Sequence, residues 1–191
     1  GKKDLITGGT KGIGLSITRE FLELGAEVLV VARNTKAIQG KVKNSANLFT
    51  YEGDLSNPDF RNDLVNRISE NWGKLDVLVN NVGTNLRKKF SEYTEPEIRQ
   101  LFETNLFSMI QLTHACYPLL QQSGSASVIN MASVAGLTDV QSGPPYGMTK
   151  AAIIQLTRHL AAEWSADRIR VNAISPWYIN TQLTEPVLSN P

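Results

Sequence analysis

The sequence predicts an α/β fold whose core is a three-layer, doubly wound parallel sheet. Short runs of β-branched and apolar residues alternate along the chain with amphipathic stretches, and short polar joints separate them. Strands and helices that alternate in this way pack as parallel strands joined by right-handed crossovers. Neither an internal repeat nor a low-complexity linker divides the 191 residues. We therefore expect one domain over residues 1–191.

Apolar runs mark the expected strands. The almost continuous runs Glu27–Ala32 and Asp76–Asn80 are typical of strands covered on both faces, and Leu48–Tyr51 is a weaker candidate. In chain order the strands are expected at Leu5–Thr7, Glu27–Ala32, Leu48–Tyr51, Asp76–Asn80, Ser127–Met131 and Ile169–Ile174.

Amphipathic stretches mark the helices between them. The helices are expected at Ile13–Leu24, Asp59–Trp72, Glu97–Leu120 and Met148–Trp164. In the second of these, apolar residues recur every four positions and so share one face; they are Phe60, Leu64, Ile68 and Trp72. Because proline lacks a backbone N–H, Pro118 predicts a break near the end of the third helix.

The composition argues against several classes of protein. Nineteen basic and 18 acidic residues give a formal charge of +1, without the basic excess that a nucleic-acid partner favours. No apolar run approaches the roughly 20 residues that span a bilayer, and no apolar segment of a secretion signal follows the N-terminal lysines. A single cysteine, Cys116, forms no internal disulfide, which fits a reducing cytoplasm. The two histidines lie far apart, so we expect no metal site.

A glycine-rich turn follows the first expected strand and opens the first helix. It reads Thr-Gly-Gly-Thr-Lys-Gly-Ile-Gly over residues 7–14. Glycines permit a tight turn and let backbone N–H groups approach a pyrophosphate, whose negative charge the helix N-terminus favours. A plain strand-to-helix turn is the alternative. The position of the turn between a strand and a helix favours a nucleotide-binding role.

Ser133, Tyr146 and Lys150 form a second motif. Ser133 follows the fifth expected strand, Tyr146 comes thirteen residues later, and Lys150 four residues after that. Side chains four residues apart on a helix project from the same face. A tyrosine and a lysine at this spacing also arise by chance on exposed helices. The serine at a strand end and the glycine turn upstream favour a catalytic site.

The two motifs together resemble those of the short-chain dehydrogenase/reductase family. The glycine spacing, Thr-Gly-x-x-x-Gly-x-Gly, is the form found in its single-domain members, and the resemblance extends over nearly the whole chain. It implies a Rossmann fold, a nicotinamide cofactor, and an enzyme that interconverts a ketone and a secondary alcohol. It further implies a small-molecule partner and a homodimer or homotetramer.

The resemblance assigns a role to each catalytic residue. A free phenol has a pKa of ~10, too high for a base at neutral pH. The Lys150 ammonium and an oxidised nicotinamide would lower the pKa of Tyr146, and a change of about three units corresponds to roughly 4 kcal/mol. In the reducing direction Tyr146 would protonate the carbonyl oxygen while Ser133 polarises it. Lys150 would also bind the ribose, and Asn105 would hold a water in a proton relay to Lys150.

The end of the second strand indicates which nicotinamide cofactor is used. A carboxylate there would bind the ribose 2′-hydroxyl, whereas an arginine accommodates a 2′-phosphate. The sequence has Arg33 at this point and Lys11 inside the glycine turn. The alternative is that both are solvated surface cations. We expect the cofactor to be NADP(H).

The resemblance places further cofactor contacts at the ends of later strands. Val82 stands where the family usually has alanine, and Trp177 stands where it usually has glycine. The full expected set is Gly8, Thr10, Lys11, Gly12, Ile13, Gly14, Arg33, Asp54, Leu55, Asn81, Val82, Gly83, Tyr146, Lys150, Ile179 and Thr181.

Two further segments resemble the tropinone-reductase-like branch of the family. They are residues 81–88 and the Pro-Trp-Tyr-Ile-Asn-Thr string at 176–181. Trp177 is expected to line the substrate pocket together with Ser133 and Tyr146. The run Arg87, Lys88 and Lys89 is either a solvated surface segment or a border of the substrate entrance.

Family members normally continue with a substrate loop, a helix and a seventh strand. The sequence ends at Pro191, so we expect the C-terminal strand and much of the substrate lobe to lie in a longer natural chain. Two other functions stay open. One is a non-catalytic protein that senses NADP(H) or binds a partner on the same fold. The other is a nucleotide-sugar epimerase or dehydratase, which the glycine spacing disfavours.

Overall fold

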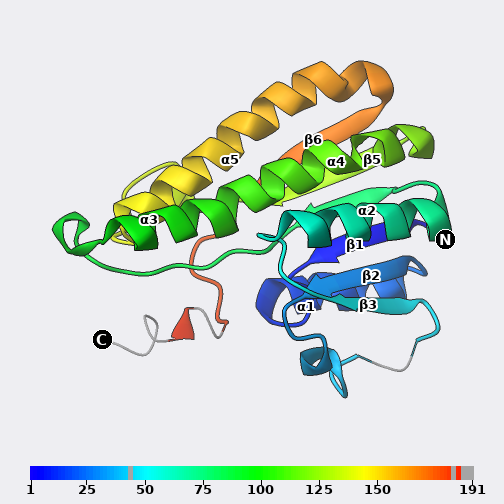
Figure 1. Cartoon of the computed structure of the whole chain (residues 1–191), viewed down its shortest axis with the longest axis horizontal. Helices are drawn as coiled ribbons and strands as arrows, with labels where there is room; N and C mark the ends of the chain where they lie inside the picture. The colour runs from blue at the N-terminus through cyan, green and yellow to red at the C-terminus, as the bar shows by residue number, and fades with distance from the viewer. Residues whose placement is uncertain (43–44, 182–183, 186–191) are drawn as a thin grey trace.

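A computed structural model gives the fold of the chain (Figure 1), and it describes residues 1–42, 45–181 and 184–185. Six parallel strands form one sheet in the order β3-β2-β1-β4-β5-β6. The strands are β1 (Lys3–Thr7), β2 (Glu27–Ala32), β3 (Leu48–Glu52), β4 (Val77–Asn80), β5 (Ala126–Met131) and β6 (Ile169–Ile174). All six strands expected from the sequence are therefore present, within two residues at each end.

Helices pack on both faces of this sheet. On one face lie α2 (Pro58–Trp72), α4 (Ser108–Ser123) and α5 (Pro144–Glu163), whose apolar residues join one cluster with Leu5, Leu78 and Val128. On the other face α1 (Gly12–Glu23) packs against Val28 and Val30 of β2. Figure 1 shows α2, α4 and α5 in front of the sheet and α1 behind it. The expected three-layer, doubly wound arrangement is confirmed.

The third expected helix differs from its prediction. It is a continuous path of α3 (Glu95–Phe102), a π-helical turn (Glu103–Phe107) and α4. The expected break at Pro118 is wrong, because α4 continues to Ser123 and ends at Gly124, whose φ is 69°. Proline removes one backbone hydrogen bond, but the buried Leu119 and Leu120 hold this turn against the core.

The helix that carries Tyr146 also begins earlier than expected. The sequence predicts its start at Met148, whereas α5 starts at Pro144. Proline has no N–H to leave unsatisfied in a first helical turn, so Pro144 and Pro145 favour this start. Tyr146 therefore lies inside the helix, and its backbone is fixed by the same hydrogen bonds that fix Lys150. No described helix is long and apolar enough to cross a membrane.

A buried ladder of amides and hydroxyls fixes the register of β4 and β5. Asn80 donates to the Oδ1 of Asn130 and to the Oγ1 of Thr113 on α4, both at 2.8 Å. Asn130 in turn donates to the Oγ1 of Thr157 on α5 at 3.0 Å. A buried donor without a partner is costly, so the two strands and two helices align where these groups meet. The ladder lies directly before the strand ends that carry the candidate site.

One buried carboxyl group has an unusual environment near the amino ends of the strands, away from the candidate site. Asp4 of β1 is 3% exposed, and its Oδ1 is buried without a hydrogen-bond partner among the described residues. Burial, and then the charge of Asp76, raise the pKa of Asp4 to about 7, against a smaller opposing effect of Lys2. The folded chain therefore keeps a proton that the unfolded chain releases near pH 4.

The variant Asp4→Asn tests this environment. Because the folded-state pKa is the higher one, the stability that depends on this proton is complete below about pH 4 and is lost as pH rises towards 7. We expect the free energy of unfolding of Asp4→Asn to exceed that of the wild type by about 2–4 kcal/mol at pH 8. At pH 4 the two free energies of unfolding should be equal. Urea unfolding at a series of pH values measures the difference. The exposed Glu70→Gln is the matched control, and a difference for Asp4→Asn that does not change with pH would contradict the assignment.

Candidate active site

A cleft of about 1580 Å³ opens at the carboxyl ends of the strands. It lies between β1 and β4, where the order in which successive strands are added to the sheet reverses. Such sheets bind ligands at this point. All but two of the expected site residues line it. Those that do are Gly8, Thr10, Lys11, Gly12, Ile13, Arg33, Asp54, Leu55, Asn81, Val82, Gly83, Ser133, Tyr146, Lys150, Trp177, Ile179 and Thr181. Gly14 and Asn105 stand behind this lining.

The glycine turn leaves the N-terminus of α1 free for an anion. Gly8 and Gly12 have φ values of 68° and 50°, which only glycine adopts readily. Lys11, at the N-cap, makes no side-chain capping bond, and the first turn of α1 contains no acidic residue. The first N–H groups of the helix and its dipole therefore face the cleft without a capping partner. This cradle fits the pyrophosphate of a dinucleotide.

Gly14 shapes the turn from behind. A Cβ at Gly14 would lie 2.3 Å from the carbonyl oxygen of Gly8 and 2.5 Å from the Nδ2 of Asn81. Asn81 uses that Nδ2 to donate to the carbonyls of Thr7 at 3.0 Å and Gly8 at 3.2 Å. The hydroxyl of Thr7 accepts from the backbone N–H of Asn81 at 2.9 Å and of Val82 at 3.2 Å. These contacts join the ends of β1 and β4.

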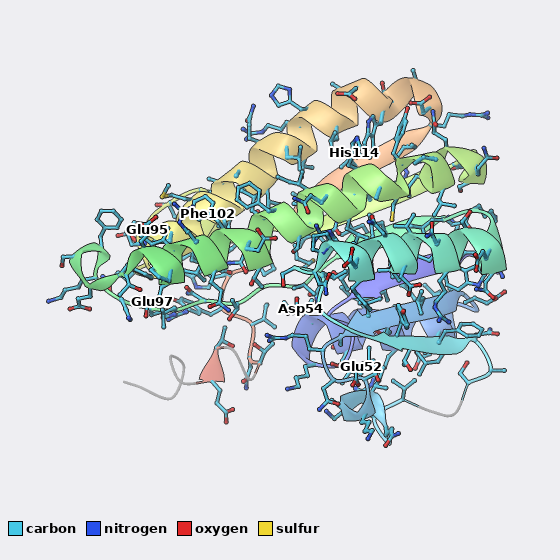
Figure 2. The ribbon with its side chains drawn as sticks, in the orientation of Figure 1. Glu52, Asp54, Glu95, Glu97, Phe102 and His114 are labelled. Carbon is cyan, nitrogen blue, oxygen red and sulfur yellow. The ribbon has the colours of Figure 1, made fainter. Side chains whose placement is uncertain are left out.

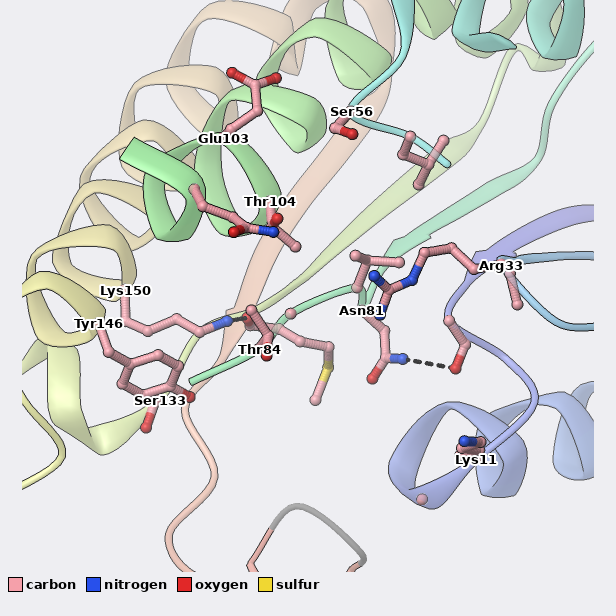
Figure 3. Close-up of a pocket in the computed structure, with 18 of the residues that line it drawn as sticks. Lys11, Arg33, Ser56, Asn81, Thr84, Glu103, Thr104, Ser133, Tyr146 and Lys150 are labelled. Carbon is pink, nitrogen blue, oxygen red and sulfur yellow. Dashed lines mark hydrogen bonds between the residues drawn. The ribbon is translucent and has the colours of Figure 1, made fainter. Parts of the chain in front are cut away.

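Two cations stand at the glycine-turn end of the cleft. Figure 3 shows Arg33 reaching towards Asn81, with Lys11 on the neighbouring helix start, and both side chains are exposed. The carboxylate of Glu52, at the end of β3, is held by the backbone N–H and hydroxyl of Thr35, which lower its pKa, and it is not among the cleft-lining residues. Asp54, by contrast, lines the cleft, and Figure 2 shows it nearer the centre of the molecule than Glu52.

The other end of the cleft brings Ser133, Tyr146 and Lys150 together (Figure 3). Lys150 is 4% exposed, and its Nζ donates to the carbonyl oxygen of Met131 at 2.7 Å. The same Nζ lies 5.6 Å from the centre of the Tyr146 ring. Ser133 follows β5, and its Oγ accepts from the N–H of Ala135 at 3.1 Å, so its proton remains free to donate. The strand end and the first turns of α5 thus position all three groups.

Burial dominates the ionisation of this group. It lowers the pKa of Lys150 to about 8. It also raises the pKa of Tyr146, while the Ser133 hydroxyl and the charge of Arg87 act in the opposite direction. In the protein alone Tyr146 is therefore a phenol at neutral pH, ready to donate a proton. The expectation that Lys150 lowers the pKa of Tyr146 remains a prediction for the protein with its cofactor bound.

Asn105 lies in the π-helical turn between α3 and α4. It is 1% exposed, its Oδ1 accepts from the N–H of Thr84 at 2.8 Å, and its Nδ2 donates to the carbonyl of Thr84 at 2.9 Å. A Cβ placed on Gly83 would lie 3.5 Å from the Oδ1 of Asn105 and 3.6 Å from the Nζ of Lys150. A side chain at position 83 would therefore lie in van der Waals contact with both groups. Single π turns of this kind are frequent at functional sites.

The segment after β6 crosses the mouth of the cleft. A Cβ on Gly12 would lie 3.3 Å from the Cγ2 of Thr181, so this segment contacts the glycine turn. Ile179 and Trp177 are 48% and 59% exposed along the same lining. Among the described residues after β6, none joins the sheet as a further strand.

Sequence reasoning missed the hydroxyl of Thr7 and several residues of the cleft lining, among them Thr84, Glu103 and Thr104. The hydroxyl of Thr7 was not expected to connect two strand ends, because only the tertiary structure brings residues 7 and 81 together. Arg87 was expected in a solvated segment or at the substrate entrance. The structure places it beside a second, smaller cavity that it shares with Ser133 and Tyr146.

Known proteins resemble the chain over most of its length. A family model described as short chain dehydrogenase matches residues 2–191. A tropinone reductase homologue of Arabidopsis thaliana is 43% identical over 193 residues, covering 98% of this chain and 73% of its own. A second one, named as chloroplastic, is 43% identical over 195 residues, covering 100% of this chain and 61% of its own. The chain thus spans about three-fifths to three-quarters of these relatives.

Solved structures agree with this match. A short-chain dehydrogenase from Streptomyces avermitilis superposes with a TM-score of 0.90 at 32% identity, covering 95% of this chain and 67% of its own. The RhlG protein of Pseudomonas aeruginosa, solved as an NADP active-site complex, superposes with a TM-score of 0.91 at 32% identity. That match covers 100% of this chain and 78% of RhlG.

Proposed function

Because the chain belongs to the short-chain dehydrogenase family, we propose that it transfers hydride between NADP(H) and a ketone or secondary alcohol. One observation carries the proposal. A single cleft has an uncapped helix N-terminus at one end and the Ser133, Tyr146 and Lys150 group at the other. A dinucleotide whose pyrophosphate lies on the first end would extend its nicotinamide towards the second.

The cofactor, when bound, would supply the hydride, and the side chains of this chain would manage the carbonyl oxygen. Ser133 retains a free hydroxyl proton and would donate it as a hydrogen bond to that oxygen. Tyr146, kept as a phenol by burial, would then transfer its proton to the oxygen as negative charge develops there. In the oxidising direction the same group must become a phenolate, which positive charge nearby favours.

Lys150 would position the ribose of the cofactor and a water of the proton relay. Its buried ammonium faces the Met131 carbonyl on one side and the space beside Gly83 and Asn105 on the other. From that position it would donate to the ribose hydroxyls and to a water held by Asn105. Because burial lowers the pKa of Lys150 to about 8, it would release a proton more readily than an ordinary lysine. This suits a group that takes part in proton relay.

We propose NADP(H) rather than NAD(H) because the residue that follows β2 in the cleft lining is a cation, Arg33, and not a carboxylate. Arg33 and Lys11 both border the glycine turn, and Glu52 is held away by Thr35. A guanidinium binds a phosphate with two parallel hydrogen bonds, whereas a carboxylate would repel it. RhlG, named as an NADP complex, has the same fold.

Three further proposals concern the whole protein. Residues 1–191 would form one cofactor-binding domain that includes the catalytic residues. Its single thiol, Cys116, is buried, which suits a reducing compartment such as the cytoplasm, although one relative is named as chloroplastic. We also propose a homodimer or homotetramer that acts on a small carbonyl compound, with neither nucleic acid nor membrane as a partner.

Replacing Tyr146 tests the proposed chemistry. Tyr146→Phe removes the proton donor and keeps the ring, so we expect turnover to fall by about 10²–10⁴-fold while NADPH binding persists. Oxidation of NADPH with a panel of ketones, together with NADPH fluorescence titration, measures both. Tyr117→Phe removes a hydroxyl of the same kind on α4, outside the cleft lining, and is the control. Binding of NADPH without turnover of any ketone by the wild type would favour a non-catalytic sensor.

Replacing Arg33 tests the cofactor preference. Arg33→Gln removes a charge-assisted contact to the 2′-phosphate, so we expect kcat/KM for NADPH to fall by about 10–100-fold and that for NADH to change little. Lys36→Gln is the control, since Lys36 is exposed and is not part of the cleft lining. If the wild type uses NADH as well as NADPH, the proposed preference is wrong.

A further inference from the structure

A second cavity of about 220 Å³ adjoins the catalytic group. It shares Ser133 and Tyr146 with the large cleft, and Trp177 borders both spaces. Its volume is below the roughly 300–1,000 Å³ of common small-molecule pockets, so it suits a compact group. Because Ser133 and Tyr146 line both spaces, a molecule in this cavity can present a carbonyl to them.

Arg87 is the one ionised side chain among the described residues that line this cavity. The other lining residues are neutral, and none of them is an aspartate or glutamate. The side chain of Arg87 is exposed, as expected for a solvated segment, and within the described part of the chain it has no ion pair and no side-chain hydrogen bond. A guanidinium beside a half-enclosed cavity, with its donors unused, is suited to bind an anion.

The backbone around Arg87 is held on both sides. The Nδ2 of Asn85 donates to the carbonyl of Ser142 at 3.0 Å, and the hydroxyl of Tyr93 donates to the carbonyl of Leu86. The next residue, Lys88, forms an ion pair with Glu97 on α3, a residue labelled in Figure 2, with 2.5 Å between Nζ and Oε1. The charge of Lys88 is thus neutralised by Glu97, whereas Arg87 lines the cavity without an ion pair among the described residues.

The side chain of Arg87 lies over the aromatic wall of the cavity. Its guanidinium carbon is 5.6 Å from the centre of the Tyr178 ring, and the Tyr178 hydroxyl donates to the carbonyl of Val140 at 3.3 Å. The positive charge of Arg87 also reaches the catalytic tyrosine, since it acts to lower the pKa of Tyr146. Because Arg87 and Tyr146 line the same small cavity, one small molecule bound there can contact both.

We propose that Arg87 binds a carboxylate of the substrate, so that the protein reduces small oxo acids to hydroxy acids. This inference rests on the proposed function and specifies its substrate class. Hydride would pass to the carbonyl carbon, Tyr146 would give its proton to the carbonyl oxygen, and the carboxylate on Arg87 would remain unchanged. The fork of the guanidinium would fix which face of the carbonyl meets the cofactor.

A carboxylate fits better than a phosphate. One guanidinium neutralises the single charge of a carboxylate, whereas the second charge of a phosphate would remain uncompensated near the apolar Val134 and Val140. The aromatic Trp177 and Tyr178 offer flat apolar surface to the part of the acid between its two polar ends. Short aliphatic and phenyl-substituted oxo acids match these walls.

Matched acids and methyl esters test the inference. The probes are benzoylformate, acetoacetate and 4-oxopentanoate, each compared with its methyl ester in NADPH-dependent reduction. We expect kcat/KM of the wild type to favour at least one acid over its ester by about 10–100-fold. In Arg87→Gln this ratio falls to about one, and Arg87→Lys, which keeps the charge without the fork, lies between.

Lys89→Gln is the control, because it removes a neighbouring exposed cation that does not line the cavity, and it should leave the ratio unchanged. Reduction of the esters by a Tyr146-dependent route, with no preference for any acid, would overturn the Arg87 inference and leave the proposed function intact. If no probe is reduced at all, calorimetric binding of benzoate to the protein–NADPH complex decides. Equal affinity in the wild type and in Arg87→Gln would overturn the inference, and weaker binding in the variant would support it.

Discussion

The buried ammonium of Lys150 is the constraint on which the site depends. Removing a charge from water is costly, and this ammonium has only the Met131 carbonyl as its hydrogen-bond partner among the described residues. It is held there because α5 is fixed across β5 by the bond from Asn130 to Thr157, two turns further along the helix. The same helix presents Tyr146 one turn before Lys150. The packing of α5 on β5 that offsets the cost of burying Lys150 thus also determines the position of the Tyr146 hydroxyl.

Positive charge is distributed along the whole cleft. Arg33 and Lys11 stand near the glycine turn, Lys150 lies in the middle, and Arg87 borders the far cavity. The uncapped N-terminus of α1 adds its dipole to this field. The lining also holds the carboxylates of Asp54, Glu95 and Glu103, with Glu95 paired to Arg99, so the positive field is local to these cations and the helix N-terminus. Such a field favours an anionic dinucleotide and, at its far end, an anionic substrate.

Local patterns made the fold and most of the site predictable. The inner strands are buried and rich in apolar residues, and the partly exposed edge strands β3 and β6 were also expected at their observed places. The Ser133, Tyr146 and Lys150 spacing depends on one strand end and one helix. The missed features depend on contacts between distant residues. The π turn at Asn105 forms where its amide meets Thr84, and α4 continues past Pro118 because the core holds the following leucines. The sequence does not show which cation of the Arg87, Lys88 and Lys89 run pairs with a carboxylate. In the structure Glu97 pairs with Lys88, and Arg87 has no ion pair among the described residues.

The ionisation of Lys150 tests this view of the site most directly. Nuclear magnetic resonance of ¹⁵N-labelled lysine side chains, with the Lys150→Met variant to assign the signal, gives its pKa in the cofactor-free protein. A pKa of about 8 is the result expected for an ammonium desolvated between Met131 and Gly83. Titration near 10.4, the value of a lysine in water, would show that the group is solvated and that the packing of α5 on β5 does not shape the site as described.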